Sequence, residues 1–148
     1  MLLPIIASLS ALAAGPRASS ELETEEASFP AQLAFDGLLQ TGWAEGEDGS
    51  GEGQWLELDL GRTTEITTVT IWPGNLAEGA KSFREHGRPR KLTLLVDGQQ
   101  VGEQLTVLDE MKRHDIAAGV SGRRLRIQID EAYEGMVFPD TYLSLIHI

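Results

Sequence analysis

The stretch FDGLLQTGW at residues 35–43, followed by QWLELDLG at residues 54–61, decides the fold class of this chain. In the second stretch Leu56, Leu58 and Leu60 alternate with acidic residues. That period of two is typical of a strand with one face in a core and the other face in water. The Asp-Gly pair of the first stretch is a turn signal. Together the two stretches predict a tight turn and a loop that lead into a half-buried strand.

Short β segments continue along the chain, separated by glycine, Asp-Gly or charged turns. After 56–60 the expected strands are residues 65–72, 91–96, 99–101, 105–108, 112–116 and 124–129. The pair Asp97-Gly98 joins two of them as a hairpin, since this dipeptide suits a two-residue turn. No long helical period occurs. The pattern therefore predicts an all-β fold, an antiparallel sandwich or jelly roll.

Composition and net charge exclude several classes of function and chemistry. The 148 residues carry a formal net charge of −11, so a general nucleic-acid function is excluded, because phosphate contacts need a basic surface. There are no cysteines, which removes disulfides, thiol nucleophiles and Cys-ligated zinc. The 41% hydrophobic content is ordinary for a globular domain. A single domain with some additional chain is expected.

The first 28 residues divide into two parts. Residues 1–14 (MLLPIIASLSALAA) are apolar, too short to span a bilayer, and end near small residues that suit a signal-peptide cleavage site. They lack a basic start, and a buried N-terminal helix is the alternative. Residues 15–28 are acidic and predict a linker, so the folded domain is expected over 29–148. Secretion, or a place in the periplasm or cell envelope, follows from this interpretation.

Several later motifs, in their order, resemble a known family. They are IWPGN at 71–75, RPRKL at 88–92, YEG at 133–135 and FPDTYLS at 138–144. With the opening turn, they are similar to the discoidin-like, galactose-binding-like domain found beside bacterial NAD-glycohydrolase toxins. The resemblance covers about residues 35–144. It implies a jelly-roll β-sandwich that binds carbohydrate and has no catalysis of its own.

The chain departs from that family in two places. Leu145 stands where the family has a glutamate, and the Pro-Gly-Asn of 73–75 is not followed by the family's tyrosine. The ending LSLIHI, residues 143–148, is similar to a translated sequencing adapter. We therefore expect these last residues to be non-native and the domain to be truncated at its C-terminus.

The Asp-Gly turn is a candidate structural calcium site. Asp36 and Thr41, with nearby carbonyls, would supply oxygen ligands of the kind a hard cation needs. The alternative is that Asp36 only caps the turn that Gly37 completes. The acidic, glycine-rich residues 45–53 lack the ligand spacing of a calcium loop and are expected to be a solvated loop. No other cofactor is expected.

The ligand site is expected on loops at one end of the sandwich, formed by residues 38–43, 72–88 and 133–140. The predicted contacts are Trp72, Asn75, Arg84, Arg88 and Tyr133. Trp72 would offer an aromatic face to a sugar, whereas Trp43 and Trp55 are expected in the core. Arg84 and Arg88 belong to a basic island with Lys81, Arg90 and Lys91 that suits an anionic ligand. Pairing of that island with the protein's own acids is the alternative.

No catalytic set stands out, because the three histidines are far apart in sequence. A non-catalytic carbohydrate-binding module is the favoured function. A protein-interaction or assembly domain of the same fold is the second hypothesis, since a fold does not determine a function. A small hydrolase using a pair such as Glu134 and Asp140 is the third.

Overall fold

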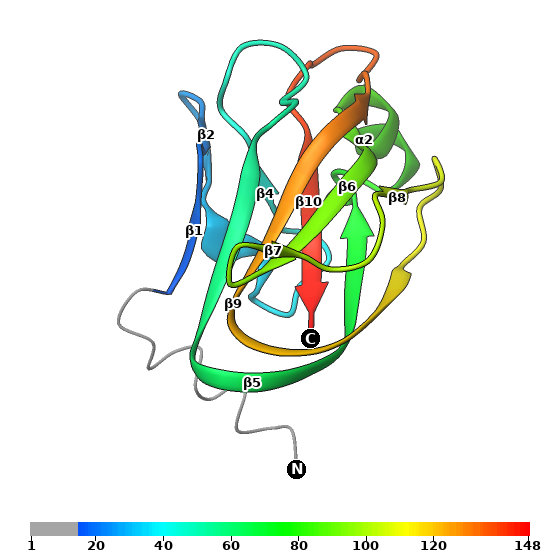
Figure 1. Cartoon of the computed structure of the whole chain (residues 1–148). Coiled ribbons are helices and arrows are strands. Elements are labelled where there is room, and N and C mark those ends of the chain that lie inside the picture. Colours follow the sequence, from blue (N-terminus) through cyan, green and yellow to red (C-terminus); the bar gives the residue numbers. More distant parts are fainter. Residues whose placement is uncertain (1–14) are drawn as a thin grey trace.

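A computed structural model describes residues 15–148, and within them the chain is an antiparallel β-sandwich with a jelly-roll topology (Figure 1). The strands are β1 (Pro16–Ala18), β2 (Leu22–Glu23), β3 (Ser28–Phe29), β4 (Trp43–Ala44), β5 (Trp55–Pro73), β6 (Arg88–Val96), β7 (Gln99–Gln100), β8 (Leu105–Thr106), β9 (His114–Tyr133) and β10 (Tyr142–His147). The helical elements are a short 3-10 turn, η1 (Ala31–Ala34), and α2 (Ala80–Glu85). The all-β prediction is confirmed.

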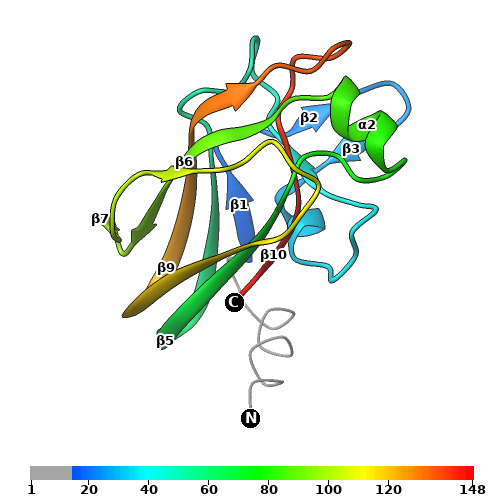
Figure 2. The same ribbon diagram turned by 90° about the vertical axis from the view of Figure 1, so that its right-hand side faces the viewer.

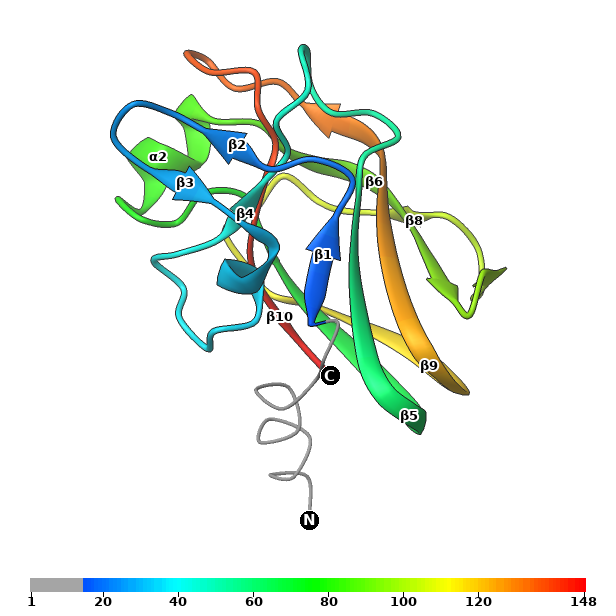
Figure 3. The ribbon, with the colours of Figure 1, turned by 90° about the vertical axis from the view of Figure 1, so that its left-hand side faces the viewer.

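Two long, bent strands connect the layers of the sandwich. β5 pairs with β9 along nearly its whole length, and both bend at the lower end of the molecule (Figures 1 and 3). The register shifts between Asp59 and Thr64, next to Gly61, where the strand turns the corner. The predicted strands 56–60 and 65–72 are thus two halves of β5, and 112–116 and 124–129 fall largely within β9.

The strand order is β4-β10-β5-β9-β6-β7, with β1 on the edge of β5 and β8 on β6. The core lies between the layers, and its large, fully buried members are Trp43, Leu56, Leu58, Ile66, Ile71, Leu92, Leu94, Leu125, Ile127, Ile129 and Leu143. Leu56 and Leu58 face inward as the alternation predicts. β10 supplies the last of these residues and closes the second layer against β4 and β5.

The predicted hairpin at Asp97-Gly98 joins β6 to β7. Both residues have positive φ, 50° and 82°, as a two-residue hairpin of the mirror-image type requires. The Asp97 carboxylate also accepts hydrogen bonds from the backbone N–H groups of Arg123 and Arg124. These hydrogen bonds therefore attach the hairpin turn to β9 at residues 123 and 124.

Two of the predictions made from the sequence need correction. Residues 15–28 are not a linker separate from the domain, because β1 pairs with β5 from Pro16 to Ala18 and β2 pairs with β3. Trp55 is not in the core. It lies half-buried on the outer face of the sheet, because every second side chain of a strand points to the same face and Trp55 therefore points the same way as Glu57 and Asp59. The expected signal peptide, residues 1–14, lies outside the described residues.

Candidate functional site

Three segments meet at the upper end of the sandwich in Figure 1, and we call them together the loop end: residues 45–53, 74–87 and 134–141. Backbone hydrogen bonds join the second and third segments. Phe138 N–H donates to Glu85 O at 2.9 Å, and Gly87 N–H donates to Asp140 O at 3.0 Å. At Gly135 a Cβ would lie 2.2 Å from Phe138 O, so only glycine fits there. The structure thus brings together two of the three loops expected to form the site.

The third expected loop, residues 38–43, lies lower on the molecule. The loop that leads into β4 runs below the loop end (Figure 2). Gly42 packs against the backbone of Leu143 and Ser144. Its neighbour Asp36 is exposed on the side of the sandwich. This loop therefore supports the sheet from the side and contributes little surface to the loop end.

Arg88 joins two loops instead of projecting freely. Its guanidinium forms a two-pronged pair with Asp109, with Nη2 to Oδ2 at 2.9 Å, and it lies over the rings of Phe83 and Tyr133 at 5.0 and 5.7 Å. The Tyr133 hydroxyl donates to Val107 O at 2.9 Å. The pair lowers the pKa of Asp109, mainly through the hydrogen bond from Arg88. The polar atoms of Arg88 and Tyr133 are therefore engaged within the protein.

The rest of the basic island is divided. Lys81 pairs with Glu85 at 3.1 Å and Lys91 with Glu131 at 3.0 Å, as the alternative interpretation expected. Arg84 is exposed, on the last turn of α2, and among residues 15–148 it forms no ion pair. Of the predicted arginine contacts, Arg84 is the one with a guanidinium open to a ligand.

Trp72 and Asn75 lie at the upper end of β5 and in the turn that follows it. Trp72 is half-buried and pairs across the sheet with Leu145. Asn75 Oδ1 accepts a hydrogen bond from Ala77 N–H at 3.0 Å, which shapes the turn into α2. Gly74, between them, packs directly against the Phe83 ring. The turn that contains Gly74 and Asn75 therefore lies against the helix that carries Arg84.

Sequence reasoning missed an aromatic stack at the loop end. The ring of His86 lies 4.7 Å from that of Phe138 in a stacked arrangement and 4.8 Å from that of Tyr142 edge to face. Phe29 packs edge-on against the other side of Tyr142. Phe138 remains 45% exposed at the outer end of the stack. The signal available in the sequence was an aromatic residue placed before proline in a strand-to-strand loop.

The acidic loop is less open than the sequence indicated. Glu45 is completely buried, and its carboxylate accepts hydrogen bonds from the N–H groups of Thr141 at 2.8 Å and Glu47 at 3.1 Å. Burial raises the pKa of Glu45 to about 7, and burial also raises the pKa of Asp140. The expectation of a solvated loop is therefore wrong for Glu45, which attaches this loop to the start of β10.

At the Asp-Gly turn four oxygen atoms converge. Thr41 Oγ1 donates to Asp36 Oδ2 and lies 3.4 Å from Leu33 O and 3.5 Å from Leu38 O. Leu38 N–H donates to Asp36 Oδ1 at 2.9 Å, a hydrogen bond typical of an Asx turn. Calcium prefers six to eight oxygen ligands, and one carboxylate among four oxygens fits that need only in part. Over residues 15–148 no three His, Cys, Asp or Glu side chains are grouped to hold a metal.

Solved structures of carbohydrate-binding modules share this fold, and the three described next are 18–20% identical to the chain in sequence. One is the family 32 CBM from C. perfringens NanJ in complex with galactose (TM-score 0.66, 18% identity, 88% of this chain and 89% of that one). A second is CpGH89CBM32-5 from Clostridium perfringens in complex with GalNAc-β-1,3-galactose (TM-score 0.67, 20% identity, 88% and 91%). A third is a chitosan-binding module from a Paenibacillus sp. IK-5 chitosanase/glucanase in complex with chitotriose (TM-score 0.66, 18% identity, 90% and 93%).

The model of the NAD glycohydrolase translocation F5/8 type C domain matches residues 10–148, and this chain belongs to that family. The resemblance stated from the sequence is thereby confirmed. No curated protein matches the chain. Within residues 15–148, no helix is long and apolar enough to cross a membrane.

Proposed function

We propose that this domain binds carbohydrate without catalysing a reaction, through its loop end. The exposed ring of Phe138, supported from behind by His86, is the observation that carries the proposal. Sugars present C–H groups on one face, which pack on an aromatic ring, while their hydroxyls need polar partners around it. The three solved relatives described above are sugar-bound modules of the same fold, which supports this assignment.

The predicted contact residues divide into two roles in this proposal. Arg84, with its open guanidinium, contacts the ligand together with Phe138, and Trp72, half-buried at the end of β5, adds a second aromatic side chain. Arg88 and Tyr133 position the loops, because their polar atoms already bind Asp109 and Val107. Asn75 shapes the turn between Trp72 and α2. The ligand is a neutral or weakly charged glycan, since Arg84 is the arginine of the loop end with an open guanidinium, while the nearby exposed Arg90 lies with its guanidinium over the Tyr133 ring at 5.6 Å.

A glycan array with the purified chain tests the proposal. We expect binding to at least one neutral oligosaccharide, and loss of most of that binding in Phe138→Ala and in Arg84→Gln. Leu38→Ala and Arg62→Gln are the matched controls, because both side chains are exposed away from the loop end. Trp72→Ala measures how much Trp72, the second aromatic residue, contributes to glycan binding. No binding to any neutral glycan by a folded protein contradicts the proposal.

One observation favours the protein-interaction alternative. Met136 is 80% exposed and Val137 60% exposed, next to Phe138, so the loop end presents three adjacent apolar side chains. Exposed apolar patches of this kind mark partner surfaces as well as ligand sites. Met136→Ser separates the two functions. A glycan site that depends on Phe138 tolerates this change, whereas a protein contact centred on the patch is weakened by it.

We also propose a weak, structural calcium site at Asp36 and Thr41, with Leu33 O and Leu38 O as further ligands. It is weak because only one carboxylate is present and Leu145 replaces the family's acid. Melting curves with millimolar calcium and with chelator test it. A higher melting temperature in calcium, absent in Asp36→Asn, is expected, and identical curves contradict it.

Finally, we propose that the protein is exported to the cell envelope or beyond it. The support is the apolar, small-residue-rich segment 1–14 in the sequence. Expression of the full chain with a C-terminal tag tests this. The expected result is a processed protein outside the cytoplasm, and full-length protein confined to the cytoplasm contradicts it.

A further inference from the structure

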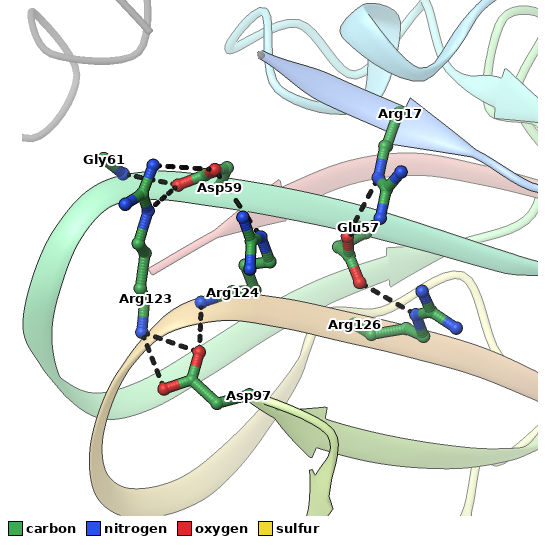
Figure 4. A network of polar contacts seen from close by, with 8 residues as sticks. All are labelled: Arg17, Glu57, Asp59, Gly61, Asp97, Arg123, Arg124 and Arg126. Carbon is green, nitrogen blue, oxygen red and sulfur yellow. Dashed lines mark hydrogen bonds and ion pairs between the residues drawn. The ribbon is translucent and has the colours of Figure 1, made fainter. Parts of the chain in front are cut away.

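A second polar surface lies outside the loop end, on the outer face of the sheet formed by β1, β5, β9 and β6. Leu56 and Leu58 face the core, so Glu57 and Asp59 project from the opposite face, and Arg124 and Arg126 do the same on β9. Arg17 reaches the same face from β1 (Figure 4). We call this surface the arginine face, defined by Arg17, Glu57, Asp59, Asp97, Arg123, Arg124 and Arg126.

The carboxylates form the floor of the arginine face. Glu57 Oε1 accepts from Arg17 at 2.7 Å and Oε2 accepts from Arg126 Nε at 2.9 Å (Figure 4). Asp59 binds Arg123 at 2.8 Å and also accepts from Gly61 N–H at 2.8 Å. The side chains of Glu57 and Asp59 are only 7% and 8% exposed. Both acids are therefore fully engaged beneath the guanidinium groups.

The arginines, in contrast, are only partly engaged. Arg126 and Arg124 each approach a carboxylate through Nε, and across residues 15–148 their terminal NH2 groups have no hydrogen-bond acceptor. Arg126 is held in place from below, because its guanidinium lies 3.7 Å from the centre of the Trp55 ring. The face carries four arginines and three carboxylates, of which Glu57 and Asp59 lie beneath the guanidinium groups and Asp97 is exposed on the hairpin, in a chain whose net charge is −11. The face thus presents cationic donors, of which Arg126 is held by both Glu57 and Trp55, where the protein as a whole is acidic.

These donors line a groove with a volume of about 390 Å³. It is bounded by Arg17, Glu57, Leu95, Asp97, Gly98, Arg124 and Arg126. The groove crosses four neighbouring strands from β1 to β6, a width of roughly 15 Å at the usual strand spacing. A space of this width accommodates two or three sugar units and is larger than a single inorganic ion needs.

We propose that the arginine face is a second binding site, specific for an acidic glycan that carries carboxylate or sulfate groups. The guanidinium fork matches those groups with two parallel hydrogen bonds, and pre-ordered side chains lose little entropy on binding. An acidic protein segment fits less well, because protein interfaces depend on buried apolar anchors. Leu95 is the groove's single apolar side chain of any size, and the large exposed apolar residues lie on other loops.

A matched pair of ligands tests the charge requirement. The probes are the trimer of galacturonic acid and its methyl ester, which keeps the hydroxyl groups and removes the charges. By calorimetry at low salt the intact chain is expected to bind the acid trimer at least tenfold more tightly than the ester. That affinity should fall as salt rises from about 20 to about 200 mM, since exposed charges are then screened. Equal binding of acid and ester overturns the proposal.

A matched pair of variants tests the location. Arg124→Gln with Arg126→Gln should weaken binding of the acid trimer at least tenfold. Arg62→Gln with Arg113→Gln removes the same charge from exposed positions outside the groove and should leave binding unchanged. If the first variant fails to fold, Arg17→Gln alone replaces it, because that side chain is 60% exposed at the edge of the groove. Equal losses in groove and control variants overturn the proposal.

Two further outcomes are decisive. Binding of polyglutamate without binding of the acid trimer overturns the proposal in favour of an acidic protein partner. Binding of the acid trimer by a protein that binds no neutral glycan supports the arginine face and contradicts the loop-end proposal. The two sites can therefore fail separately, because Phe138→Ala affects one and the paired arginine change affects the other.

Discussion

The loop end and the arginine face use charged side chains in opposite ways. At the border of the loop end Arg88 is 11% exposed and its guanidinium pairs with Asp109, while Glu45, within the loop end, is buried without a cation beside it. On the arginine face Glu57 and Asp59 are buried and the arginines lie above them, with terminal NH2 groups of Arg124 and Arg126 that have no acceptor within residues 15–148. The first arrangement holds loops in place, and the second presents charge to solvent. A charged residue is thus a ligand contact only where its partners leave donors unused.

Acidification should stabilise the loop end. Folded Glu45 keeps its proton up to about pH 7, whereas the unfolded chain loses it near 4.5. The folded state therefore binds more protons between these values, so the free energy of unfolding falls as the pH rises from 4.5 to 7. We expect an increase of at most about 3 kcal/mol between pH 7.5 and pH 5. Urea unfolding at the two pH values measures it.

Glu45→Gln is the control for this prediction, because the amide cannot titrate and keeps an oxygen for Thr141 N–H. The pH dependence between 5 and 7.5 should shrink in this variant. Asp59 and Asp109 have lowered pKa values, so their contributions are lost only in more acidic solution. A pH dependence that is the same in the variant and the parent shows that Glu45 is not its source.

Arg88→Ala should produce the next largest effect. The change removes the pair with Asp109 and the packing of the guanidinium on Phe83 and Tyr133, and we expect a loss of about 2 kcal/mol in unfolding free energy. Arg84→Ala, on the adjacent helix, should change it by less than about 0.5 kcal/mol. Equal effects of the two changes contradict the division into positioning and contact residues.

Glu57→Gln should have a smaller effect on the arginine face. It removes the charge beneath Arg17 and Arg126, whose guanidinium groups can still turn to water, and we expect a loss of about 1 kcal/mol. Glu65→Gln is the control, an exposed acid further along β5. Chemical denaturation measures both. A loss from Glu57→Gln greater than that from Arg88→Ala reverses the comparison between the two regions.

The sequence predicted the faces of the strands better than the contacts between loops. Alternation at 56–60 and 124–129 correctly placed leucine and isoleucine inward and charge outward. The same alternation also puts Trp55 outside with Glu57, so the expectation of a core tryptophan was a misreading of the pattern. The strands predicted over 56–60 and 65–72 are one strand, β5, which bends at Gly61, where glycine permits the positive φ of 80°.

The loop end could not be predicted at the same level. Arg88 and Asp109 are 21 residues apart, and Glu45 meets Thr141 across 96 residues. Such contacts depend on how the two layers of the sandwich bring loops together. The alternation of apolar and polar residues within one strand carries no information about them. The sequence did identify the segments 72–88 and 133–140 as neighbours through their resemblance to a family. It did not identify Phe138 or Glu45, since their roles arise from burial and stacking.

The central claim is that a neutral glycan binds at the loop end, separately from the arginine face. Backbone amide NMR during titration with a neutral oligosaccharide, chosen from the glycan array, tests it most directly. We predict shifts confined to residues 74–87 and 134–141, with the Trp55 indole and residues 124–126 unchanged. Shifts centred on Trp55 and residues 124–126, or no shifts at saturating neutral sugar, would contradict the claim.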